Sequence, residues 1–487
     1  MLDEGKNCWR IEAADRFALV IDAERYFAVA REAMMMAQRR IMLVGWDFDA
    51  RIVLDPAATD GDGPAKVGQF FHWLVERNPE LEIFLLRWDV GALKTLLRGT
   101  TLFTVFKLAT HPRIHVKLDA HHPTGSSHHQ KLVSIDDSFA FCGGIDMTSE
   151  RWDTRQHRDF EPGRTDPRGK AYKPWHDATT AISGPAAKAL GEACRNRWVK
   201  AGGTPIDPVD LPGDCWPANL DPVMSDVRVG IARSQPVMDD KQPVREIEAL
   251  FLDQIASAKR YVYFETQYFA SRRVAEAIAR RLAEEDGPEF VIVHPLTAEG
   301  WLQPIAMDSA RARLVTELKA RDLHDRLRLY HPQTGSGEPI YVHAKITIVD
   351  DRQLRVGSAN LNNRSLRLDT ECDVIVDDAE NPHQKLQAVI RNIRNDLLAE
   401  HLGVSIDRVA ELIGQTGSLI QAIERLRRDG HSLVPYRTPD LSQVKAWLAD
   451  NEILDPEGPD DMFEPIGKRS LLEGLGKHIE RTGRDVR

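Results

Sequence analysis

The sequence predicts an α/β protein built from two like α/β halves packed about a pseudo-twofold axis and followed by a C-terminal helical appendage. Three observations predict this fold. A residue pattern occurs twice at a constant offset of 214 residues, helical and strand periodicity alternate around each copy, and the periodicity becomes purely helical from about Arg394. We therefore expect a first half at residues 1–225, a second half at 226–395 and a mainly helical appendage at 396–487.

Composition places the chain among soluble globular proteins. It has 487 residues, of which 42% are apolar and 28% charged, and a net charge of −10. The acidic balance argues against nucleic acid as a partner, although it leaves a local basic groove open. Five scattered cysteines without a CxxC pair indicate a reduced compartment. We see no signal peptide and no run of 18 apolar residues, so we expect a cytoplasmic or peripherally membrane-associated protein, with signal-independent export left open.

The repeated pattern is HxKxxxxD. It comprises His129, Lys131 and Asp136 in the first copy and His343, Lys345 and Asp350 in the second. A turn of small residues follows each Asp after seven positions, GGID in the first copy and GSAN in the second. One HxK is weak evidence, whereas two copies that share the downstream Asp and turn are strong evidence for a duplicated site.

Strand alternation predicts where these side chains point. If His129 begins a strand, it shares a face with Lys131, Val133 and Ile135. Charged groups on an inward face need partners, so the alternatives are a functional site and a strand end at the surface. A metal is not favoured at the cluster His121, His122, His128 and His129, because zinc would need a Cys, Asp or Glu ligand set with fixed geometry and we see no such set nearby in sequence. We expect no metal and no cofactor.

The flanking segments repeat as well, each reading as a helix followed by a strand. The pairs are residues 23–49 with 245–269, 66–88 with 273–295, and the short strands 113–118 with 326–332. A further strand follows each turn, and an acid begins it: Asp177 in the first copy and Glu371 in the second. A solvated strand end is the alternative interpretation of these acids. The first copy has a polar insert at residues 151–173, which we expect to be a surface loop.

Two imidazoles and two ammonium groups that meet at the interface between the halves favour an anionic substrate, above all a phosphodiester. The lysines can neutralise phosphate oxygens, and Asn360 can add a hydrogen bond. One neutral imidazole can attack phosphorus while one imidazolium protonates the leaving alcohol. A carboxylate on the far nitrogen of each ring would fix its tautomer, a role that suits Asp177 and Glu371. The aromatic residues near the motifs either line a pocket or serve the core: Trp152, Trp175, Tyr268 and Phe269.

The duplicated motif resembles the phospholipase D superfamily, and its phospholipase D branch in particular. The resemblance runs from about Asn7 to about Gly403 and is carried by GWDFDARI, GGIDMTSERWDTRQHR, PWHDATTAISGPAA, ETQYF, IYVHAKITIVDD, VGSANLNNRSLRLDTECDV and LAEHLG. It implies two α/β/α units with the site between them, and hydrolysis of phospholipids with transfer of the phosphatidyl group to alcohols. It also implies His129 as nucleophile and His343 as acid, an order that the symmetry of the two copies leaves open.

The resemblance also implies that other positions in the motifs support the site without touching the substrate. Asp136 and Asp350 should support the strand ends rather than touch phosphate, and Gly144 and Ser358 lie in the small-residue turns. Asp146, where the second copy has Asn360, departs from the pattern. Because an acid would repel phosphate, we expect Asp146 to turn to the backbone or to a lysine.

Four functions compete. The main prediction is a phospholipase D that acts at a phospholipid membrane surface with water or an alcohol as acceptor, and we expect it to be a monomer. The alternatives are a cardiolipin synthase-like phosphatidyltransferase with the same catalytic residues, a nuclease of the superfamily, and a non-catalytic lipid-binding scaffold. The acidic charge disfavours the nuclease, and the two intact motifs disfavour the scaffold.

Overall fold

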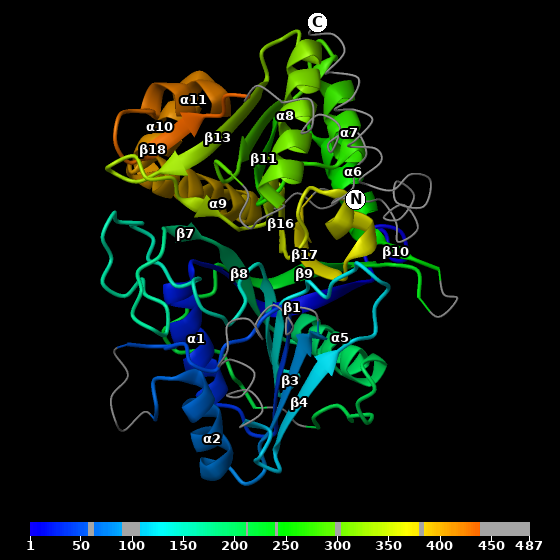
Figure 1. The fold of residues 1–487 in the computed structure, drawn as a ribbon. Coiled ribbons are helices and arrows are strands. Elements are labelled where there is room, and N and C mark those ends of the chain that lie inside the picture. The colour runs from blue at the N-terminus through cyan, green and yellow to red at the C-terminus, as the bar shows by residue number, and fades with distance from the viewer. Residues whose placement is uncertain are drawn as a thin grey trace, which may run out of the picture.

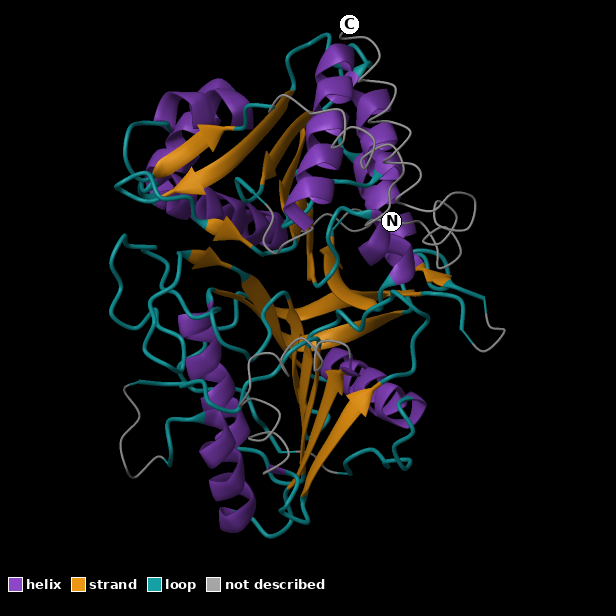
Figure 2. Ribbon diagram, viewed as in Figure 1, coloured by secondary structure: helices purple, strands orange, loops and turns teal. Residues whose placement is uncertain are grey.

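The computed structural model describes residues 1–56, 63–89, 108–210, 213–238, 242–297, 303–378 and 384–438. It confirms the predicted α/β class, with helices on both sides of a long sheet (Figures 1 and 2). Strands of the first half are β1 (Arg10–Ile21), β2 (Arg40–Gly45), β3 (Glu82–Trp88), β4 (Ile114–Asp119), β5 (Leu132–Ile135), β6 (Phe139–Gly143), β7 (Trp175–His176) and β8 (Ala178–Ser183). Those that follow are β9 (Met224–Gln235), β10 (Val244–Arg245), β11 (Tyr261–Glu265), β12 (Glu289–Val293), β13 (Leu327–Gln333), β14 (Tyr341–Val342), β15 (Ile346–Val349), β16 (Gln353–Gly357), β17 (Glu371–Asp377) and β18 (Ser432–Pro435).

The order of the strands in the sheet is the same when read outward in either direction from a central antiparallel pair, β1 and β9. On one side follow β8, β6, β5, β2, β3 and β4, and on the other β17, β16, β15, β11, β12 and β13. In each of these two series the last three strands run parallel. Their middle strands, β3 and β12, are short apolar runs that are buried on both faces, as parallel strands usually are. The predicted duplication is therefore visible as a palindromic sheet.

Helices cover both faces of each half. They are α1 (Ala23–Met35), α2 (Val67–Arg77), α5 (Pro185–Lys200), α6 (Glu246–Ser257), α7 (Arg272–Leu282), α8 (Gln303–Arg321), α9 (Gln384–Leu402), α10 (Ile406–Thr416) and α11 (Leu419–Leu426). One apolar cluster packs α1 and α2 on the first half, and a second packs α6, α7 and α8 on the other half. A third cluster joins α5 and α9 to strands of both halves, so the two sandwiches share a core.

The boundaries of the three expected units fall inside elements of the structure. Residues 225 and 226 both lie in β9, and residues 395 and 396 both lie in α9. After α9, strand β18 pairs antiparallel with β13, so the described part of the expected appendage extends the sheet as well as adding helices. Residues 439–487 of that unit lie outside the described residues. The division into three units stays a proposal.

No helix among the described residues combines the length and the apolar character that crossing a membrane requires.

Candidate active site

Each motif histidine lies in a segment that pairs with the opposite half. His343 follows β14, which pairs in parallel with β7, and its backbone N–H donates to the carbonyl of His176 at 2.7 Å. The backbone N–H groups of His129 and Gln130 donate to the carbonyl of Thr370, at 2.9 Å each. The expected strand therefore begins only at Leu132, since the backbone before it bonds across the interface instead of continuing the β5 ladder. The expected alternation from His129 through Lys131 is wrong in this respect.

The two acids that begin the later strands bind the histidines of the opposite halves. Nδ1 of His129 lies 3.0 Å from both carboxylate oxygens of Glu371, and Nδ1 of His343 lies 2.6 Å from Oδ2 of Asp177. Both acids are buried, so they are not the solvated strand ends of the alternative interpretation. A carboxylate at Nδ1 fixes the proton there and leaves Nε2 as the reactive nitrogen of each ring.

Both motif lysines are buried beside the histidines. Nζ of Lys131 donates to the carbonyl of His129 at 2.7 Å and lies 3.1 Å from Oδ2 of Asp146. Asp146 also accepts from the backbone N–H of Trp46 at 3.1 Å, so it turns to a lysine and to the backbone, the orientation expected of it. Lys345 donates to the carbonyl of His343 and lies near the side-chain oxygen of Gln267.

The second half has neutral groups where the first half has an acid. Oδ1 of Asn360 accepts from the backbone N–H of Gln267 at 3.2 Å, and its amide group lies 3.4 Å from the side-chain oxygen of Gln267. Lys131 thus has a carboxylate partner, whereas the Lys345 ammonium has an amide oxygen.

The small-residue turns press against the orienting acids. The hydroxyl of Ser358 donates to Glu371 at 2.5 Å. Gly144 takes the same place in the first half, and a Cβ there would lie 2.2 Å from Oδ1 of Asp177. Only glycine fits so close to this carboxylate.

The motif aspartates anchor a hairpin rather than facing the histidines. Asp136 accepts from the backbone N–H groups of Gln38, Arg39 and Arg40 at 2.6 to 2.9 Å, at the start of β2. Asp350 accepts in the same way from three successive N–H groups at the start of β11, those of residues 259–261. Each Asp also has a positive φ in the turn after β5 or β15, a conformation that Asp tolerates better than most residues.

Comparison with known proteins finds relatives that are named as phospholipases D. Residues 251–394 match the family described as "Cardiolipin synthase, PLD-like domain". Phospholipase D A of Dictyostelium discoideum is 24% identical over 473 residues, which cover 79% of this chain and 35% of that protein. Phospholipase D alpha 1 of Carica papaya is 24% identical over 450 residues, which cover 69% of this chain and 53% of that protein. Both comparisons point to the phospholipase D superfamily. It spans less than two thirds of the length of these relatives.

A solved structure has a similar fold. The phosphatidylserine synthase of Haemophilus influenzae Rd KW20 superposes with a TM-score of 0.54 at 14% identity, over 85% of this chain and 96% of that one. At this level of identity the likeness concerns the fold.

Burial shifts the pKa values of the ionisable groups in the site. Burial, followed by the charges of the two lysines, holds the pKa of His129 well below its usual value. Burial and the charges of Lys345 and Arg151 do the same to the pKa of His343. Burial lowers the pKa of Lys345 to about 7 and raises the pKa of Glu371 to about 8. Both imidazoles are therefore neutral in the ligand-free site near pH 7. Nε2 of either ring then has a lone pair with which to act as a nucleophile.

Sequence reasoning missed two residues of this site. Gln267 lies between Lys345 and Asn360, and the only signal for it was its position in the ETQYF segment. Arg151 begins the polar insert, and its guanidinium lies 4.2 Å from the ring centroid of Trp175, which in turn lies 5.1 Å from the ring of His343. Of the aromatic candidates, Trp175 thus borders the site, while Phe269 is buried in the core of the second half.

The insert at residues 151–173 is only partly the surface loop that we expected. Asp153, His157 and Arg164 are buried, and Arg164 binds both carboxylate oxygens of Asp153 at 3.1 Å. The four clustered histidines near the first motif do not form one donor set among the described residues. His122 contacts Asp89 at 2.8 Å and His128 contacts Asp119 at 3.2 Å.

Proposed function

We propose that the protein is a phospholipase D that hydrolyses the distal phosphodiester bond of glycerophospholipids to phosphatidic acid and a free headgroup alcohol. The observation that carries this proposal is the pair of imidazoles, each bound at Nδ1 by a carboxylate from the opposite half and each followed by a buried lysine. Two nitrogen bases from opposite halves, with two cations, suit an in-line displacement at phosphorus, where one base attacks and the other protonates the leaving oxygen.

In the first step, the lone pair on Nε2 of His129 attacks phosphorus and the bond to the headgroup oxygen breaks. His343, protonated at Nε2, gives its proton to the departing alkoxide, so the headgroup leaves as a neutral alcohol. Because the phosphate is an anion, its arrival raises the pKa of the nearby imidazole and lysine groups, which supplies the protonated acid. Lys131 and Lys345 balance the negative charge on the non-bridging oxygens.

In the second step, His343 is neutral and removes a proton from water as the water oxygen attacks phosphorus. The bond between phosphorus and Nε2 of His129 breaks, and phosphatidic acid is released. An alcohol in place of water yields a new phosphatidyl ester by the same route. Electrons and protons balance in both steps, since the proton that His343 gives in the first is regained in the second.

Two contacts support His129 as nucleophile and His343 as acid and base. The 2.6 Å contact with Asp177 is the shorter of the two histidine–carboxylate contacts, and a close carboxylate stabilises an imidazolium. The side chain of His129 is 16% exposed and that of His343 is 6% exposed, so His129 is the more accessible to an incoming phosphorus atom.

A phosphatidyltransferase of the cardiolipin synthase type is the second candidate, and the family description that matches residues 251–394 favours it. It would use the same residues and the same intermediate, and would differ in the acceptor that reaches His343. Phospholipid at a membrane surface is the substrate in both cases, with the protein bound peripherally as a monomer.

The test compares purified wild-type protein with His129→Ala on mixed phospholipid vesicles that contain added ethanol. We expect free headgroup, phosphatidic acid and phosphatidylethanol from the wild type alone, because phosphatidylethanol requires a phosphatidyl intermediate. Products with a lipid acceptor but none with water would promote the transferase. Cleavage of a nucleic-acid substrate without any lipid product would overturn the proposal in favour of the nuclease.

A further inference from the structure

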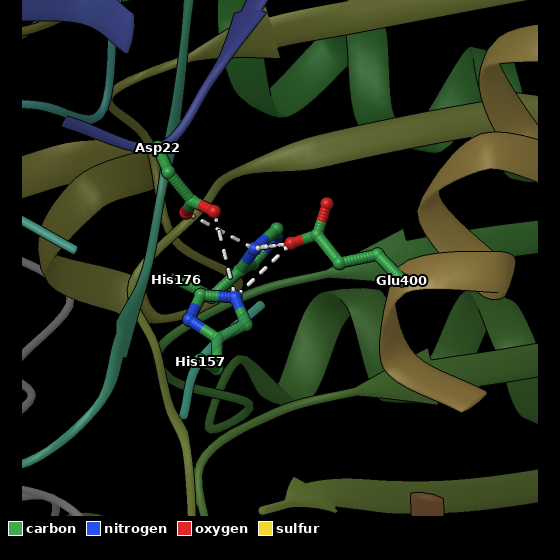
Figure 3. A group of neighbouring side chains, drawn as sticks. All are labelled: Asp22, His157, His176 and Glu400. Atoms are coloured by element: carbon green, nitrogen blue, oxygen red, sulfur yellow. Dashed lines mark hydrogen bonds and ion pairs between the residues drawn. The ribbon is translucent and has the colours of Figure 1, made fainter. Parts of the chain in front are cut away.

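A second group of ionisable side chains lies behind the catalytic pair, and the proposed reaction does not use it. It comprises Asp22, His157, His176 and Glu400, which converge on one point (Figure 3). They come from four separate segments: the turn between β1 and α1, the polar insert, strand β7 and helix α9. None of the four side chains is more than 2% exposed.

The donor atoms of this cluster, which we call the buried histidine–carboxylate cluster, are spaced like ligands around one ion. Nε2 of His157 lies 3.1 Å from Oε1 of Glu400 and 3.4 Å from Oδ2 of Asp22. Nδ1 of His176 lies 2.8 Å from the same Glu400 oxygen and 3.4 Å from Oδ1 of Asp22. Ligands about 2.0 to 2.2 Å from a tetrahedral ion are roughly 3.3 Å apart, close to these separations.

Two of these atoms are buried without a hydrogen bond among the described residues. They are Oδ2 of Asp22 and Nδ1 of His176, although Nε2 of His157 lies 3.4 Å from the first and Oε1 of Glu400 lies 2.8 Å from the second. A buried polar atom without a hydrogen bond is costly in a hydrogen-bonded network. Atoms that share an ion as ligands have this arrangement, because their lone pairs point to the ion and not to one another.

Carboxylates also hold the far nitrogens of both rings. Nδ1 of His157 lies 3.0 Å from Oδ2 of Asp153, and Nε2 of His176 lies 2.9 Å from Oε2 of Glu265. Metal-bound histidines almost always have such a carboxylate or carbonyl partner on the second nitrogen, which fixes the ring with its other nitrogen toward the ion.

We propose that the cluster binds one divalent first-row transition ion, zinc above all, through Nε2 of His157, Nδ1 of His176 and one oxygen each of Asp22 and Glu400. Two imidazoles with two carboxylates are a donor set that suits zinc, whereas calcium and magnesium prefer oxygen ligands alone. The set is closed by four protein ligands, which is typical of a structural ion rather than a catalytic one.

An ion at this place would hold in position the segment that carries Asp177, the acid that orients His343. Oδ1 of Asp22 accepts from the backbone N–H of Asp177 at 3.1 Å, and the carbonyl of His176 accepts from the N–H of His343 at 2.7 Å. An ion at the cluster would therefore tie α9 and the insert to the strand that carries the orienting acid of His343. It would touch neither substrate nor the reacting atoms.

The full chain can be tested by metal analysis after purification without chelators or affinity metals. We expect about one zinc per chain by mass spectrometry, anomalous scattering at the cluster in crystals, and a lower melting temperature after dialysis against 1,10-phenanthroline that added Zn²⁺ restores. Cobalt in place of zinc should give the visible absorption of a four-coordinate site.

Variants of the proposed ligands test whether the ion binds at this cluster. Asp22→Asn and His157→Gln should lower the zinc content at least tenfold. His115→Gln should retain zinc, because it removes a histidine with a carboxylate partner, Glu82, at another place. Wild-type protein that takes up no stoichiometric zinc and melts at the same temperature with and without chelator would overturn the proposal, and it would do so even where the variants fail to fold. Zinc that both variants retain, or anomalous density elsewhere, would overturn it as well.

Discussion

Asp177 and His343 are 166 residues apart in sequence, and a 2.6 Å contact joins Oδ2 of the first to Nδ1 of the second. Glu371 makes the reciprocal contact with His129. Each half therefore supplies one imidazole and the carboxylate that orients the imidazole of the other half. The two roles in the proposed reaction can be separated by changing residues in opposite halves.

A substrate with an activated leaving group distinguishes nucleophile from acid. We expect His343→Ala to lose at least about a hundredfold in hydrolysis of phosphatidylcholine, because the headgroup alkoxide then leaves without a proton. With phosphatidyl-p-nitrophenol the same variant should release a burst of about one equivalent of p-nitrophenol and then stall, since no base activates water. His129→Ala should give no burst. A burst from His129→Ala alone, measured by stopped-flow absorbance, would reverse the two roles.

The orienting acids should follow the histidines that they contact rather than the half in which they lie. Asp177→Asn should slow turnover of phosphatidylcholine by up to about 10⁴-fold yet keep the p-nitrophenol burst, because it disturbs His343. Glu371→Gln should abolish the burst, since it disturbs His129. Glu248→Gln, which removes a carboxylate bound to Arg367, is the control and should change neither. Equal loss of the burst in both acid variants would contradict the crossed assignment.

The rate should depend narrowly on pH. Lys345 loses its charge as the pH rises through about 7, and Glu371 gains its charge as the pH rises through about 8. Because both charges are needed, kcat/KM should peak between these values and fall on either side. The profile of kcat should extend further to alkaline pH, since bound phosphate raises the pKa of Lys345. If kcat/KM stayed constant from below pH 7 to above pH 8, the charges of Lys345 and Glu371 would not control the rate.

The motif aspartates should matter for stability rather than for chemistry. Asp136→Ala leaves three backbone N–H groups at the start of β2 without their acceptor, and we expect it to lower the free energy of unfolding by about 3 kcal/mol. Its kcat, corrected for the folded fraction, should stay within about twofold of wild type. Denaturant unfolding measures the first quantity, with the exposed Asp286→Ala as control. A loss of kcat without a loss of stability would instead place Asp136 in the reaction.

Membrane contact is expected at the insert that leads into β7. Phe160 is 76% exposed there, and the neighbouring Asp159 binds the turn at Ser336. Phe160→Ser should weaken activity on vesicles about tenfold, because the ring no longer enters the interface, and should leave activity on a monomeric short-chain phospholipid unchanged. Leu323→Ser is the control, since Leu323 is equally exposed beyond α8. If Leu323→Ser weakened activity on vesicles more than Phe160→Ser does, the membrane contact would lie at the end of α8 instead.

The duplication made much of the fold predictable, because two like sequences fold alike. The repeated pattern anticipated the matched order of strands on either side of β1 and β9. It did not anticipate that these two strands join the halves into one sheet, since nothing local to a strand states which edge it pairs with. The helix α9 crosses an expected boundary for a similar reason: its apolar face packs on both halves, and periodicity does not reveal the partner.

The site was predictable in its residue types and not in its connections. Alternation indicates which side chains share a face, but the crossed contacts of Asp177 and Glu371 depend on the interface between the halves. His157 and Glu400 lie in segments that the repeat does not contain, so no symmetry argument singled them out. The only signal was their presence in the segments TRQHRDF and LAEHLG, for which no chemistry was apparent.

The crossed carboxylates have a consequence for synthesis on the ribosome. In a nascent chain that has emerged only as far as β8, His129 has no orienting acid and Asp177 has no imidazole to hold. Under the proposed mechanism, phosphodiester cleavage must wait until Glu371 leaves the exit tunnel and β17 docks beside β9. A translation product that ends before Glu371 would therefore lack the proposed activity.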